Sequence, residues 1–189
     1  MTPTKENKGH NLPLLIENWM TLNKTPFSDW KVCIQHKNIL LICLEIFEEM
    51  EMVLRKDRKD HISVKMAFRE IKDDIEILCT YQVQPAICVL FYTLVCQTNP
   101  EQVLFSGKDR TLQFAVFCHE EEKCDMDNEI VEKCSQSALQ YLQSVGYDVK
   151  YSGESSRKVI SILMPENKMW GKASTSENEE GANVRTPRK

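Results

Sequence analysis

Glycine is scarce in this sequence. The chain has six glycines in 189 residues, and neither the phosphate-binding pattern G-x-x-x-x-G-K-[ST] nor the dinucleotide pattern G-x-G-x-x-G occurs. Loops of this kind need several glycines because their backbone N–H groups must come close to the phosphates. The Gly107-Lys108 pair is better explained as the tip of a hairpin. Nucleotide hydrolysis is therefore not expected, we predict no cofactor, and the sequence identifies no small-molecule substrate.

An excess of positive charge and a long apolar run are also missing. The chain has 28 acidic and 24 basic residues, a net charge of −4, which disfavours direct binding to nucleic acid. Residues 77–100 carry no charge, but their continuous apolar part, 86–96, is 11 residues long, whereas a membrane-spanning helix needs about 20. The N-terminus has no apolar signal region. We predict no membrane association.

Motifs for nucleophilic catalysis and for structural zinc are absent as well. There is no G-x-S-x-G, and no C-x2-C pair that would let two thiolates reach one zinc ion. The eight cysteines lie mostly in apolar runs, which favours reduced, buried thiols inside the cell. The weak candidates for a metal site are Cys118, His119, Cys124 and Cys134. The first two are adjacent, so a strand would point them to opposite faces. We name no catalytic residue and predict that the chain is not an enzyme.

The chain divides into a central domain and flanking segments. We predict a disordered tail over residues 1–11, a segment over 12–38 whose only assigned element is a short helix near 13–22, a single domain over 39–165, and a disordered tail over 166–189. Near its end, Thr186 precedes Pro187, Arg188 and Lys189, the form of a proline-directed phosphorylation site. This pattern favours the nucleus over the cytoplasm.

Two helices are predicted at the start of the domain. From residue 39, apolar side chains recur at steps of three and four and place one stripe along a helix; they are Leu40, Cys43, Phe47, Met50 and Leu54. The same spacing predicts a second helix from Asp60 or Ser63 to about Thr80. Its stripe is Val64, Phe68, Ile71, Ile75 and Leu78.

Strands and one further helix are predicted in the rest. Residues 86–96 are rich in Val, Ile, Phe and Tyr, which favours a buried strand, although periodicity alone leaves a short core helix open. A hairpin follows over 103–118, with Gly107 at its bend. A helix then runs from Asp127 or Asn128 to Gly146, which ends it, and a second hairpin covers 147–164. The predicted class is α+β, with the order α-α-β-ββ-α-ββ and helices packed on one face of a mostly antiparallel sheet.

The order of elements is similar to that of two families. A long helix, a strand pair, another helix and further strands over about 60–164 resemble HORMA adaptor domains, which implies binding of a partner peptide. The second resemblance concerns the order strand, loop, helix and hairpin, with Gly146 between the helix and the hairpin. This order is similar to the latter half of a GHKL-type ATP-binding fold. Where that family has D-x-G-x-G, this chain has HEEEK after Cys118. The glycines that would contact the nucleotide are missing, so this resemblance implies a pseudo-ATPase used as a scaffold.

The functional prediction is a non-enzymatic intracellular module that binds another protein. It is an adaptor or scaffold subunit of a complex, nuclear or cytoplasmic, and associated with chromosomes if the HORMA resemblance applies. A degenerate GHKL-like or HORMA-like scaffold is one alternative. A divergent enzyme with a Cys-based or zinc centre is the other.

Overall fold

The computed structural model describes residues 14–22, 24, 35–56, 61–71, 76–118, 128–154 and 156–165. Along the chain these form α1 (Leu14–Leu22), β1 (Gln35–Asn38), α2 (Ile39–Lys56), β2 (Ser63–Glu70), β3 (Glu76–Cys79), α3 (Val83–Thr98), β4 (Gln102–Lys108), β5 (Thr111–Phe117), α4 (Asn128–Ser144), β6 (Asp148–Glu154) and β7 (Arg157–Leu163). The predicted tails, 1–11 and 166–189, lie outside the described residues and remain predictions.

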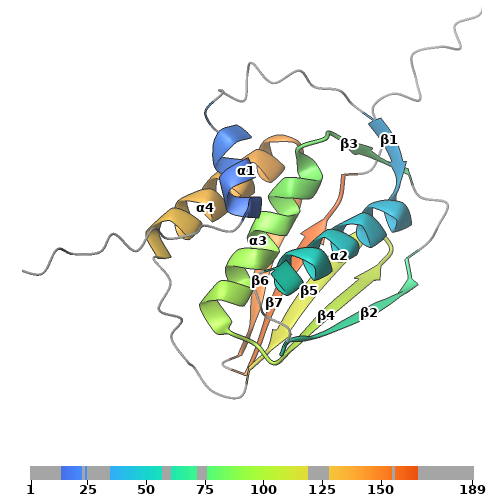
Figure 1. The fold of residues 1–189 in the computed structure, drawn as a ribbon. Helices are drawn as coiled ribbons and strands as arrows, with labels where there is room; N and C mark the ends of the chain where they lie inside the picture. Colours follow the sequence, from blue (N-terminus) through green and yellow to red (C-terminus); the bar gives the residue numbers. More distant parts are fainter. Residues whose placement is uncertain are drawn as a thin grey trace, which may run out of the picture.

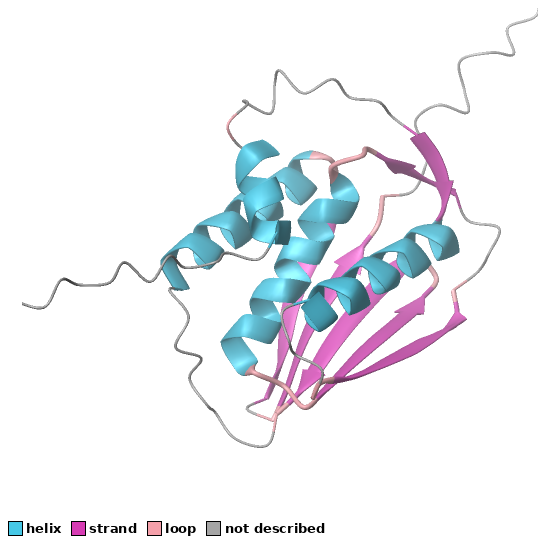
Figure 2. Cartoon of the chain, in the orientation of Figure 1, coloured by secondary structure: helices cyan, strands magenta, loops and turns pink. Residues whose placement is uncertain are grey.

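Five strands make one sheet, and the helices lie on one of its faces (Figures 1 and 2). The strand order is β2-β4-β5-β7-β6, and β1 pairs with β3 in a separate two-stranded sheet. The pairs β4–β5, β5–β7 and β6–β7 are antiparallel, whereas β2–β4 is parallel. Parallel neighbours need a long crossover, and β3 and α3 provide it between β2 and β4. The predicted class, helices on one face of a mostly antiparallel sheet, is confirmed.

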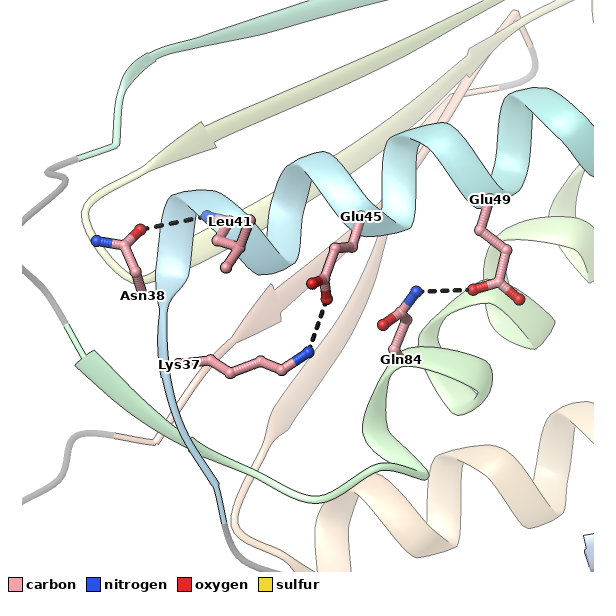
Figure 3. A network of polar contacts seen from close by, with 6 residues as sticks. All are labelled: Lys37, Asn38, Leu41, Glu45, Glu49 and Gln84. Carbon is pink, nitrogen blue, oxygen red and sulfur yellow. Dashed lines mark hydrogen bonds and ion pairs between the residues drawn. The ribbon is translucent and has the colours of Figure 1, made fainter.

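The predicted helix from residue 39 is confirmed as α2, and its start is well defined. The side-chain oxygen of Asn38 accepts hydrogen bonds from the N–H groups of Leu40 and Leu41 at 2.8 and 3.2 Å (Figure 3). Such a cap satisfies donors that have no partner within the helix. Along α2, Cys43, Met50 and Leu54 are buried, together with three isoleucines that widen the apolar stripe.

The predicted helix over 60–80 is wrong. Residues 63–70 form the edge strand β2, and residues 76–79 form β3. The apolar spacing fits both structures. Val64 and Phe68 are four residues apart, and because side chains of a strand return to the same face every two residues, this spacing also places them on one face of a strand. Both side chains therefore lie on one face of β2, where they pack against the core. The remaining members of the supposed stripe lie beyond the end of this strand.

The predicted strand over 86–96 is also wrong, and the alternative of a core helix is correct. Thirteen of the sixteen residues of α3 are buried. Because α3 contacts α1, α2, α4 and the sheet, it is apolar all round and shows no amphipathic repeat. Pro85 lies in its first turn, where no intrahelical partner for an N–H is lost. Asn99, in the left-handed conformation at φ 41°, ends the helix before Pro100.

Both predicted hairpins are confirmed, with one change at the first turn. The bend between β4 and β5 is Asp109-Arg110, so Gly107 lies within β4. A Cβ atom at Gly107 would lie 2.4 Å from Cδ1 of Ile71, so a larger residue there would have to displace the Ile71 side chain. The second hairpin joins β6 and β7 in register from Asp148 opposite Leu163 to Glu154 opposite Arg157.

The helix predicted to end at Gly146 is confirmed as α4. Gly146 has φ +90°, and its N–H donates to the carbonyl of Gln143 at 3.1 Å. The N–H of Tyr147 donates to the carbonyl of Leu142 at 2.9 Å. These two bonds are the pair that defines a Schellman motif, which satisfies carbonyls at the end of a helix.

The core lies between the sheet and the helices. Phe91 on α3 stacks on Phe114 of β5 with ring centroids 4.4 Å apart, and both rings contact the edge or face of Phe105 on β4. Phe47 on α2 meets Phe105 edge-on at 5.4 Å. These four rings join α2, α3, β4 and β5. Within the described part of the chain, no helix is both long enough and apolar enough to cross a membrane.

The short helix predicted near 13–22 is confirmed as α1 and belongs to the packed structure. Its Trp19 side chain is fully buried, and Nε1 of Trp19 donates to Oγ of Ser137 on α4 at 2.7 Å. The Trp19 and Tyr141 rings lie 6.1 Å apart. The segment 12–38 therefore contributes core residues ahead of α2.

Candidate functional site

The four candidate metal ligands do not form a described cluster. Cys118 follows β5 and is half-buried, while Cys134 is buried on α4. His119 and Cys124 lie outside the described residues. Among the residues that the structure describes, no group of three His, Cys, Asp or Glu side chains could hold a metal ion. Thr186 also lies outside them, so its modification remains a prediction.

The buried thiols are poor nucleophiles. Burial raises the pKa of Cys43 on α2 to about 12, and it also raises the pKa of Cys134. Burial raises the pKa of Cys88 on α3 well above its usual value, and the charge and hydrogen bond of Glu49 raise it further. A thiolate is the reactive form of cysteine, and these sites keep the thiol protonated.

A polar network joins β1, α2 and α3 above the core (Figure 3). Nζ of Lys37 lies 2.9 Å from Oε2 of Glu45, and Nε2 of Gln84 donates to Oε2 of Glu49 at 2.9 Å. Figure 3 shows the two glutamates one turn apart on α2, each turned toward a different partner. Each carboxylate is therefore engaged in holding elements together, which is a structural role.

A second polar group is buried between α3 and α4. The hydroxyls of Thr80 and Tyr141 are hydrogen-bonded, and the Tyr141 hydroxyl donates to Oε1 of Gln82 at 3.3 Å. Gln82 is 1% exposed, and its Nε2 has no hydrogen-bond partner among the residues that the structure describes. The group fixes the start of α3 against α4.

A cleft of about 310 Å³ lies between the C-terminal half of α3, the N-terminal half of α4 and β6. Its apolar side chains are Leu90, Leu94 and Leu139, and the Tyr151 ring of β6, 53% exposed, forms one wall. The remaining lining residues are polar: Thr93, Gln97, Glu132, Ser135 and Gln136. The cleft therefore has apolar side chains and one carboxylate, that of the exposed Glu132.

Tyr151 connects this cleft to the edge of the sheet. Partial burial raises the pKa of the Tyr151 phenol, and a hydrogen bond with Ser135 of α4 opposes this shift. β6 is the last strand of the five-stranded sheet, and six of its seven residues are exposed. Within the described residues, no strand pairs with its outer edge. An unpaired edge presents backbone donors and acceptors beside the cleft.

The cleft has little chemistry for holding a nucleotide. Magnesium nucleotides need oxygen ligands for the metal and backbone N–H groups or positive charge for the phosphates. α3 carries no charged side chain. No glycine occurs between Gly107 and Gly146, the stretch that contains β5, residues 119–127 and α4. The described walls of the cleft carry no positive charge that could hold phosphates.

The face of the sheet away from the helices has a different character. One register row runs through Lys65, Leu104, Ala115, Val159 and Ser152, from β2 to β6. Its centre is apolar and its ends are polar. Beside this row, the Arg157 guanidinium lies over the Phe117 ring at 5.6 Å. Among the described residues, no helix packs on this face (Figure 2).

Sequence reasoning missed the cleft. Its lining comes from α3, α4 and β6. The sequence predicts a strand where α3 lies, so no pattern places these residues together. The available signals were the apolar stripe of α4 and the alternation of Tyr147, Val149 and Tyr151. They indicate a helix and a strand but not their contact.

No protein-family model matches the chain, and no curated protein matches it. Solved structures do match. The Acinetobacter baumannii histidine kinase AdeS has a TM-score of 0.51 at 8% identity, over 81% of this chain and 76% of that chain. The cytoplasmic segment of the histidine kinase QseC has a TM-score of 0.49 at 11% identity, over 80% of this chain and 91% of that one. At such identities a likeness shows the fold and nothing about activity. The likeness to AdeS supports the GHKL-type fold.

Proposed function

We propose that this chain is a non-enzymatic interaction module, a GHKL-like domain that acts as an adaptor or scaffold subunit of a protein complex. One observation carries the proposal. At the place of D-x-G-x-G the chain has HEEEK, and no glycine lies between Gly107 and Gly146. This stretch of sequence therefore lacks the glycines that let the backbone N–H groups of a nucleotide loop come close to phosphates.

Two further features support this proposal. The side of the cleft formed by α3 is uncharged, so α3 supplies no carboxylate for a metal ion. The pKa values of Cys43, Cys88 and Cys134 are raised, which argues against the alternative of a Cys-based enzyme. The proposed partner is another protein, and the proposed location is the nucleus or the cytoplasm.

The nucleotide part is tested by calorimetry of the full chain with ATP and Mg²⁺, alongside an assay of phosphate release. We expect no saturable binding at millimolar ATP and no hydrolysis above the buffer rate. Saturable Mg²⁺-dependent binding would contradict the proposal.

The interaction part is tested by purifying the tagged full chain from cells that express it natively, followed by size-exclusion chromatography. We expect a protein partner to co-elute in a fixed ratio. The Phe114→Ala variant, which removes a ring from the core, is the control for capture by unfolded chain. A partner that is retained equally by this variant does not bind the folded module. Metal analysis of the same sample tests the zinc alternative, for which we expect no stoichiometric zinc.

A further inference from the structure

We infer that β6 binds an extended segment of a partner protein by strand addition, and that this segment places an apolar side chain in the cleft beside Tyr151. The inference rests on the proposed function and deepens it by naming the surface and the kind of partner. In strand addition, main-chain hydrogen bonds supply affinity and pockets for alternate side chains supply specificity.

The edge of β6 is suited to receive a strand. β6 pairs with β7 over seven residues without a register shift. The opposite edge strand, β2, has a register shift between Ala67 and Glu70. Bulges disrupt pairing at sheet edges, and β6 lacks one in its ladder. Of the two edges, β6 therefore has the longer ladder without a register shift, and its one unusual backbone conformation, Gly153 at φ +129°, lies near the end of the strand.

The cleft lies where side chains of an added strand would reach. Successive side chains of a strand point to opposite faces, so alternate residues of the added segment lie on the helix side. Tyr151 points to that side, since it lines the cleft together with α3 and α4. The volume of about 310 Å³ accommodates one or two apolar side chains, and Leu90, Leu94 and Leu139 provide their contacts.

The charge of the helices and the cleft indicates which residues the partner segment carries near its apolar residue. The four helices together carry seven acidic and three basic side chains, and Glu132 is the one charged residue that lines the cleft. A partner with Lys or Arg two positions from its apolar residue would place a positive charge on the helix side, near Glu132. The occupant is therefore an apolar and basic segment in an extended conformation.

A second copy of β6 fits this surface less well. In an antiparallel pair centred on Tyr151, Asp148 of each copy would face Glu154 of the other, and a pair centred on Lys150 would place the two lysines opposite each other. Like charges directly opposite destabilise a strand pair. A register centred on Ser152 places Lys150 opposite Glu154 and avoids this repulsion, but it pairs five of the seven residues of β6.

The test selects peptides from a phage-displayed library of 16-residue segments, with the full chain as bait, and measures the enriched peptides by fluorescence anisotropy. We expect an apolar residue with Lys or Arg two positions away. Tyr151→Ala should weaken binding by about tenfold or more, as truncation of a central aromatic contact does. Tyr81→Ala is the matched control, because Tyr81 is 52% exposed and lies outside the cleft lining; its affinity should change by less than about twofold.

A charge exchange gives an independent readout. Glu132→Lys should weaken the selected peptide, and replacing the basic residue of the peptide with Glu should restore the affinity. Glu48→Lys, at an exposed position of α2 outside the cleft lining, is the control and should leave binding unchanged. Hydrogen exchange of the bound chain should show slower exchange over residues 148–154.

Each other outcome overturns the inference in a distinguishable way. Peptides that bind equally well to the Tyr151 and Glu132 variants use another surface, and the proposed function then stands without this site. Self-association that depends on Tyr151 makes a second copy the occupant. Failure to enrich any peptide overturns the inference, and the absence of a co-eluting partner in the purification overturns the proposed function separately.

Discussion

The two faces of the five-stranded sheet are built from alternate residues of the same strands, yet they differ in almost every property. On the covered face, Phe105 and Phe114 are fully buried against Phe91 of α3. On the open face, their neighbours include Gln113 and Ser106, whose side chains are exposed or half-buried. The apolar row on that face is narrow. The difference teaches that most of the stability resides on the covered face, which leaves the exposed residues of the open face and of the β6 edge available for change without loss of the fold.

The largest expected effect is a difference in the free energy of unfolding between variants of two neighbouring residues of β5, one on each face of the sheet. Phe114→Ala should lower the free energy of unfolding by about 3–5 kcal/mol, because it removes a buried ring and leaves a cavity. Gln113→Ala should change it by less than about 0.5 kcal/mol, since its side chain is exposed and its bond to Ser161 is long, at 3.4 Å. Urea unfolding of both variants measures the contrast. Similar losses for the two would show that the open face also supports the fold.

A smaller effect is expected at Gly107, which lies on the covered face of β4. Gly107→Ala should destabilise by about 1–3 kcal/mol, because the new Cβ atom meets Ile71 at 2.4 Å from Cδ1 and 2.8 Å from Cγ1. The adjacent Ser106→Ala, on the open face, is the control and should be nearly neutral. Adding Ile71→Val to the Gly107 variant removes Cδ1 and should recover part of the loss in urea unfolding. An absence of recovery would contradict the packing explanation.

The covered face also predicts a pH dependence through Cys43. Burial raises the pKa of this thiol from 9.0 to about 12. Between these values the unfolded chain loses the proton while the folded chain keeps it, so stability falls as the pH rises. Between pH 9 and 10 this thiol lowers the free energy of unfolding by about 1 kcal/mol. In urea unfolding under reducing conditions, Cys43→Ala should show a shallower decline between pH 9 and 10 than the original chain. Equal slopes would be inconsistent with a buried, protonated thiol.

The smallest effect is expected on the open side of β6. Lys150→Ala should change the free energy of unfolding by less than about 0.5 kcal/mol, because its ion pair with Asp148, at 3.0 Å, is exposed. Thermal unfolding at low and high salt measures this. A loss above 1 kcal/mol, on the order of a partly buried pair, would mean that charges on β6 support the fold and are not free to serve a partner.

The elements that the sequence predicts correctly are those with one apolar side and one polar side. α2 and α4 carry an apolar stripe, and the strand pairs β4–β5 and β6–β7 alternate between faces, so their type follows from periodicity. α3 is buried on every side, and its apolar residues lose the helical repeat that would have identified it. β2 shows the opposite ambiguity, because its two core contacts are four residues apart.

The candidate site could not be predicted for a related reason. A cleft is a property of three elements that meet in space, and its apolar residues serve the core and the cleft together. Leu139, for example, packs partly against the core and partly lines the cleft. The expectation that the chain does not hydrolyse nucleotides, in contrast, rests only on the missing glycines, which the sequence shows directly.

The parallel pairing of β2 with β4 has a consequence for the order in which the chain assembles. Ser63 lies opposite Gln102, and β3 and α3 separate the two strands in the chain. The β4–β5 hairpin closes over a two-residue bend and can form early, since local contacts cost little chain entropy. During synthesis from the N-terminus, β2 emerges first but has no partner until β4 follows. The edge strand β2 is thus synthesised early and pairs with β4 late. In that interval its Met66, which is exposed in the folded chain, must avoid contacts with other chains.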